Sequence, residues 1–66
     1  AGEAALRERL VEDDYAFVRE AAARALGGLG GLPEPTRAAL RAASTEDPEA
    51  RVRAAATAAL GEGTRP

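Results

Sequence analysis

Two acidic clusters are the residues of this sequence best suited to hold a cation or to form a paired acid and base. Each cluster stands just before a segment with helical periodicity, where carboxylates are stabilised by the helix macrodipole and by bonds to first-turn amides. No other type of metal ligand accompanies them. We therefore predict structural roles and no metal site for the clusters, which are Glu12, Asp13 and Asp14 in one and Glu46, Asp47 and Glu49 in the other.

The residues that usually carry out nucleophilic catalysis are almost absent from this sequence. Ser44 is the only serine, and the sequence contains no His to activate it and no Cys to replace it. The glycines at 27, 28, 30 and 31 are not accompanied by the Lys and Ser or Thr of a phosphate-binding loop. We predict that the chain is not an enzyme, that no residue is catalytic, and that no cofactor binds.

The basic residues do not create a positive field. Nine Arg are balanced by eleven acids, giving a net charge of −2, and a groove for nucleic acid needs an excess of positive charge. No apolar run is long enough to span a membrane, and no basic start followed by an apolar core indicates a signal peptide in these residues. We expect a cytoplasmic protein without a nucleic-acid or membrane partner. The richness in Ala, Gly, Arg and Pro indicates a bacterial genome rich in G and C.

The elements that must position these residues occur twice. A shift of 34 residues aligns residues 3–27 with 37–61, and 14 of the 25 pairs are identical. In the second half of each copy, apolar residues recur at i, i+3, i+4, i+7 and i+8, which predicts an amphipathic helix. These residues are Val18, Ala21, Ala22, Ala25 and Leu26 in the first copy, and Val52, Ala55, Ala56, Ala59 and Leu60 in the second.

The ends of these second helices carry their own signals. Asp13 and Asp47 precede them and are expected to accept bonds from first-turn amides. Pro48 fits the first helical position, where a missing N–H is tolerated, and Gly27 and Gly61 are placed to end the helices in the left-handed conformation.

The first half of each copy is predicted to be a shorter helix, over residues 4–11 and 35–44. The glycine-rich connection at 28–34 is short enough to return the chain antiparallel. The predicted fold is all-α, with four helices in two stacked hairpins that form a segment of an α-solenoid. Residues 1–66 form a single domain in this prediction, with repeat one at 3–27 and repeat two at 35–61.

Both copies resemble HEAT repeats, in particular the short bacterial type related to phycobilin-lyase HEAT-like repeats. In that type the second helix opens with D-P-x-x-x-V-R, followed by A-A-A-x-A-L-G. Residues 47–61 read DPEARVRAAATAALG and residues 13–27 read DDYAFVREAAARALG, with Asp14 in place of the proline. The resemblance implies that Asp13 and Asp47 cap the second helices. It also implies that Arg19 and Arg53 reach toward a neighbouring repeat.

The two copies differ most at the turn between their paired helices. Polar residues replace four apolar ones there: Leu10, Val11, Tyr15 and Phe17 become Ser44, Thr45, Glu49 and Arg51. One explanation is that the second copy is the polar cap of a solenoid while the first packs against a neighbour. The other is that Tyr15 and Phe17, the only aromatic residues, anchor a protein partner. We predict a partner or self-association surface at Leu10, Val11, Tyr15 and Phe17.

The resemblance implies a binding scaffold, so protein–protein interaction or scaffolding is the predicted function. An accessory segment of a larger enzyme, such as a tetrapyrrole (bilin) lyase-like protein, is the alternative, and a nucleic-acid scaffold is a third. About three or more repeats are normally needed to bury a continuous core. We therefore expect the chain to be a piece of a longer array or to form a homo-oligomer.

Overall fold

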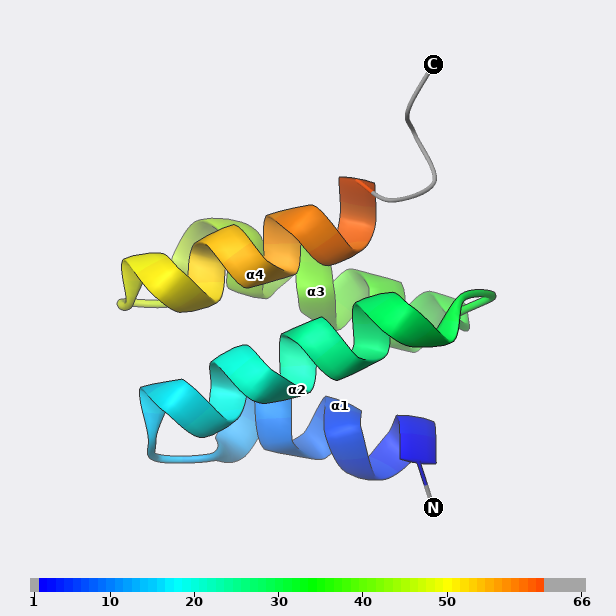
Figure 1. Cartoon of the computed structure of the whole chain (residues 1–66), viewed down its shortest axis with the longest axis horizontal. Helices are drawn as coiled ribbons and strands as arrows, with labels where there is room; N and C mark the ends of the chain where they lie inside the picture. The colour runs from blue at the N-terminus through cyan, green and yellow to red at the C-terminus, as the bar shows by residue number, and fades with distance from the viewer. Residues whose placement is uncertain (1, 62–66) are drawn as a thin grey trace.

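Four helices form almost all of the chain in the computed structural model, which describes residues 2–61. Helices α1 (Gly2–Glu12) and α2 (Ala16–Leu29) form one hairpin, and α3 (Glu34–Glu46) and α4 (Ala50–Gly61) form the second. Figure 1 shows α2 and α4 side by side in one layer, with α1 and α3 behind them. The predicted all-α fold of two stacked helical hairpins is confirmed.

Each helix contributes one large apolar side chain to the centre of the core. Leu10, Leu26, Leu40 and Val52 are at most 2% exposed, and each contributes roughly 2 kcal/mol when it is removed from water. Alanines fill the space between them. Because alanine side chains are short, the helices lie close together, and the backbone positions matter as much as the side chains.

The inward face of α2 differs from the predicted stripe. Ala21 and Ala25 are exposed, whereas Ala23, which lies outside the stripe, is completely buried. The reason is that α2 has two neighbours, since it packs on α1 with one side and on α4 with another. Thr57, which occupies in α4 the position of Ala23, is exposed. In α4 the predicted stripe faces inward along its whole length.

The end of α2 also differs from the prediction. The helix continues past Gly27, and the turn is closed by Gly30 and Gly31, with φ of 73° and 58°. The connection is therefore shorter than the predicted 28–34. A Cβ added at Gly27 would lie 3.0 Å from both Cα and Cβ of Ala59 in α4. Gly27 is thus a point of close helix approach rather than a helix stop.

The two aspartates lie in the turns that precede α2 and α4. Asp13 Oδ1 accepts the N–H of Tyr15 at 2.9 Å, and Asp47 Oδ1 accepts the N–H of Glu49 at 3.0 Å. Tyr15 is the N-cap residue of α2 and makes no side-chain cap bond. The carboxylates therefore close an Asx-type turn ahead of each helix instead of capping its first turn. Pro48 lies in the same turn, since α4 begins two residues later.

Candidate binding surface

The four apolar residues that were predicted to form one surface have different environments. Leu10 is only 2% exposed and packs in the core, so it does not belong to the exposed surface. Its neighbour Val11 is 60% exposed, because one residue turns the side chain by about 100° around the helix axis. Tyr15 and Phe17 are 64% and 63% exposed. Three of the four residues are therefore available to a partner.

Tyr15 and Phe17 are in contact with one another. Their ring centroids are 5.8 Å apart and the ring planes are inclined by 37°, a tilted arrangement that aromatic pairs favour. Tyr15 stands at the start of α2 and Phe17 in its first turn. We refer to these two residues as the aromatic pair. It presents two large side chains to solvent at the start of α2.

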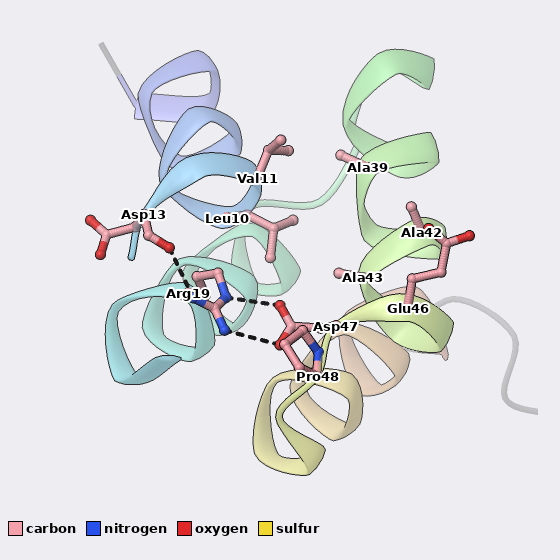
Figure 2. Close-up of a pocket in the computed structure, with 10 residues that line it drawn as sticks. All are labelled: Leu10, Val11, Asp13, Arg19, Ala39, Ala42, Ala43, Glu46, Asp47 and Pro48. Atoms are coloured by element: carbon pink, nitrogen blue, oxygen red, sulfur yellow. Dashed lines mark hydrogen bonds and ion pairs between the residues drawn. The ribbon is translucent and has the colours of Figure 1, made fainter. Parts of the chain in front are cut away.

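A groove of about 380 Å³ lies between α1 and α3 (Figure 2). Its walls are mostly apolar, with Leu10 and Val11 on one side and alanines of α3 on the other, and Asp13 and Glu46 also line it. At one end of the groove Arg19 meets Asp47, so the charges there are already paired. An apolar side chain suits this groove better than a charged ligand. The alanines are Ala39, Ala42 and Ala43.

The pair of Arg19 and Asp47 joins the two hairpins. Arg19 Nε donates to Asp47 Oδ2 at 2.8 Å and Nη2 donates to Oδ1 at 3.2 Å. Nη1 donates to the backbone carbonyl of Asp13 at 2.9 Å, so all three guanidinium nitrogens are bonded. The side chains of the pair are 12% and 8% exposed. Arg19 thus contacts the second hairpin, which is the direction that the family resemblance implies for it.

The pair also sets the ionisation of its members. Burial acts to raise the pKa of the Asp47 carboxyl. The hydrogen bonds from Arg19 and from the N–H of Glu49, together with the charges of Arg19 and Arg53, outweigh burial and hold that pKa below its usual value. The hydrogen bond to Asp47 is the main reason that the pKa of Arg19 is raised. Both groups are charged at neutral pH.

Arg53 is the counterpart of Arg19 in the second repeat, but it has fewer bonds. Its Nη1 donates to the carbonyl of Asp47 at 2.7 Å, as Arg19 does to the carbonyl of Asp13. Within residues 2–61, however, no carboxylate lies within ion-pair distance of Arg53. Glu49, which lies four residues before Arg53 on the sequence, does not form an ion pair with it. Arg53 therefore does not contact a neighbouring repeat in the described part of the chain.

The other arginines of the described helices lie next to acids. Most of these ion pairs join residues on the same helix, such as Arg24 and Glu20 at 2.9 Å, whereas Arg51 of α4 lies 3.9 Å from Glu20 of α2. The hydrogen bond from Arg41 is the main reason that the pKa of Glu34 is lowered.

The two acidic clusters do not form a metal site in the described part of the chain, because no group of three or more potential metal ligands occurs among residues 2–61. None of the four helices is long and apolar enough to cross a bilayer.

Sequence reasoning missed one contact between the hairpins. Arg7 Nη1 donates to the hydroxyl of Thr36 at 3.1 Å and also to Glu3 at 3.1 Å. Thr36 is completely buried at the start of α3, so its hydroxyl needs this bond. The only available signal was the pair of Glu3 and Arg7 at i,i+4, which gives no indication of a partner 29 residues away.

Two stacked helical hairpins, joined by an arginine that reaches from one to the other, define a helical-repeat protein of the α-solenoid class. Comparison with protein families finds that HEAT repeats match residues 1–61. The chain therefore belongs to the HEAT-repeat family, whose members generally serve as protein-interaction and scaffold modules. Comparisons with curated proteins and with solved structures found no match.

Proposed function

We propose that this HEAT-repeat segment is a non-catalytic protein-binding module and that the aromatic pair is its anchor. The observation that carries the proposal is the exposure of Tyr15 and Phe17, at 64% and 63%, at the start of α2. Large aromatic side chains dominate the energies of protein interfaces, and leaving two of them in water is unfavourable unless a partner covers them.

The charges around the anchor support a protein as the partner. Glu20 and Arg24, which follow the aromatic pair along α2, are bonded to one another, and Glu20 also lies 3.9 Å from Arg51 of α4, so acids and bases of this region are mixed. Such a mixed rim suits a protein surface, where an apolar centre is surrounded by polar residues. It does not provide the continuous positive potential that a nucleic acid requires.

A photoreactive side chain tests this proposal directly. Benzoylphenylalanine is placed at Phe17 in one variant and at Ala38, an exposed residue of α3, in the control. Each variant is irradiated alone and in a lysate of a bacterium with a GC-rich genome. We expect a cross-linked protein product from position 17 that position 38 does not give. The absence of a product specific to position 17 in both samples would overturn the proposal.

A further inference from the structure

Helices α2 and α4 are the equivalent second helices of the two repeats, and they contact one another through different sides. Gly27 of α2 lies against Ala59 of α4, and Arg51 of α4 lies 3.9 Å from Glu20 of α2. Ala23 and Ala55 are buried between these points. We call these two surfaces the forward side, which is Arg19, Ala23 and Gly27 in α2, and the backward side, which is Arg51, Ala55 and Ala59 in α4.

Both sides occur a second time without a helix packed on them. By the 34-residue shift, the backward side of α2 consists of Phe17, Ala21 and Ala25, and all three are exposed. The forward side of α4 contains Arg53 and Thr57, and Thr57 is exposed. Within residues 2–61 these positions are open to solvent, apart from Arg53, which is half-buried. Within residues 2–61, α2 therefore exposes a copy of the backward side, and α4 exposes a copy of the forward side.

The charges of the two uncovered sides are complementary. In the internal interface Arg19 binds the carboxylate of Asp47, and the equivalent residues at the two ends are Arg53 and Asp13. Arg53 has no carboxylate within ion-pair distance among residues 2–61. The Asp13 carboxylate accepts the N–H of Tyr15 and otherwise faces the largely exposed Arg9 at 3.7 Å. Arg53 of one molecule and Asp13 of another repeat the internal pair.

One further difference between the two interfaces is also matched. Inside the chain, Arg51 lies beside Glu20, a charged pair. The equivalent positions at the ends are Phe17 and Ala54, and both are apolar and exposed. If only one of these two positions had become apolar, a charged residue would face an apolar one. Both positions are apolar at the ends, so Phe17 and Ala54 are matched in the way that Arg51 and Glu20 are.

We propose that a second copy of the chain docks head to tail, with its backward side of α2 on the forward side of α4 of the first copy. Phe17 of the second copy then covers Ala54, and Arg53 of the first copy binds Asp13 of the second. The inference rests on the proposed function and specifies its partner. Because each molecule retains one uncovered side of each kind, the association is open and continues by addition of further copies.

Thr57 limits the affinity of this contact. It occupies the position of Ala23, which is completely buried in the internal interface, and it carries a hydroxyl and a methyl group more. The contact between copies is therefore less closely packed than the internal one, and we expect the association to be weak. The substitution Thr57→Ala should strengthen association.

Complementation between two blocked variants tests the proposal. Phe17→Glu blocks the backward side of α2, and Ala54→Glu blocks the forward side of α4, while Ala38→Glu provides a matched control at an exposed position of α3. Sedimentation equilibrium measures the mass of each variant over a concentration series, and circular dichroism verifies its helicity. If Phe17→Glu does not fold, Ala21→Glu on the same side replaces it.

The expected result is directional. The wild type and Ala38→Glu grow in mass with concentration, and each blocked variant alone stays at its monomer mass, near 6.8 kDa for the unaltered chain. An equimolar mixture of the two blocked variants, which retains one intact pair of sides, reaches about twice that mass and stops there.

Three outcomes would overturn the head-to-tail arrangement. A wild type that is monomeric at every concentration refutes it, and a cross-link from position 17 to a foreign protein would then still support the proposed function. Association that Phe17→Glu abolishes and Ala54→Glu leaves intact indicates a symmetric dimer. A mixture of blocked variants that stays monomeric, although the wild type associates, shows that the two sides do not meet.

Discussion

The bond between Arg19 and Asp47 should account for a large share of the stability of this chain. Replacing Asp47 by Ala removes two charge-assisted hydrogen bonds, at 2.8 and 3.2 Å, and the turn bond to Glu49. It also leaves the Arg19 guanidinium, whose side chain is 12% exposed, with only its bond to the carbonyl of Asp13. Asp13→Ala is a matched control, because Asp13 closes the same type of turn without binding an arginine of the other hairpin.

The magnitudes separate the two variants. Removing one partner of a buried ion pair costs about 3 to 5 kcal/mol in all, and losing a single turn bond costs about 1 kcal/mol. We therefore expect a loss of about 3 kcal/mol for Asp47→Ala and about 1 kcal/mol for Asp13→Ala. A chain of this length has a total stability of roughly 3 to 10 kcal/mol. The larger loss thus brings the variant close to unfolding.

Urea unfolding followed by circular dichroism measures both losses. With a slope of about 1 kcal/mol per molar urea, the midpoint should fall by about 3 M for Asp47→Ala and by about 1 M for Asp13→Ala. The samples are kept dilute, so that self-association does not contribute to the midpoints. Equal midpoints for the two variants would show that the bond between the hairpins adds nothing beyond the turn bond, and the reasoning would be refuted.

Three further predictions follow from the same contacts. The pKa of Asp47 is lower in the folded state than in the unfolded state, so the stability that its carboxylate contributes is fully present above the unfolded pKa of about 3.9 and is lost as the pH falls through the folded pKa. The free energy of unfolding should therefore fall less steeply with decreasing pH in Asp47→Asn than in the wild type. Gly27→Ala should destabilise by about 1 kcal/mol, since contacts of 3.0 Å with Ala59 outweigh the gain in helix propensity, whereas Gly28→Ala, with nothing within 4 Å, should stabilise by about the same amount; a loss of stability in both would contradict this. Thr36→Val should cost about 1 kcal/mol in urea unfolding by removing the hydroxyl that accepts a bond from α1, and an unchanged midpoint would show that this bond is dispensable.

The sequence was sufficient to predict the helices and their pairing because those signals are local and repeated. The apolar stripe of α4 faces inward as its periodicity predicts. Pro35 lies in the first turn of α3 as expected. Each of these features depends on residues within one or two turns, so a single sequence contains all the information that they require.

The errors arose where a distant segment decides the outcome. Gly27 has the local signature of a helix end, but its role is set by Ala59, which lies 32 positions later and packs against it. Ala21 and Ala23 differ only in which neighbour each meets, so composition could not show that the second is buried and the first exposed. Leu10 and Val11 are adjacent in the sequence and chemically similar, and only the packing of α1 against the other helices separates them.

The placement of the candidate surface was therefore predicted in part. Comparison of the two copies directed attention to the turn after α1, because two aromatic residues occur there and nowhere else. It did not show that their rings touch, nor that a groove opens between α1 and α3 nearby. Both features depend on how the second hairpin is stacked on the first, which the repeat itself does not specify.

The arginine that joins the hairpins has a consequence for how such chains are inherited. Each 34-residue unit carries an aspartate in its turn and an arginine in its second helix, and the junction within residues 2–61 is formed by Arg19 of the first unit and Asp47 of the second. A gene duplication that copies one unit therefore copies both halves of the junction together. The lineage gains a longer protein without any compensating mutation, and later substitutions, such as those at Phe17 and Ala54, are free to diversify the ends.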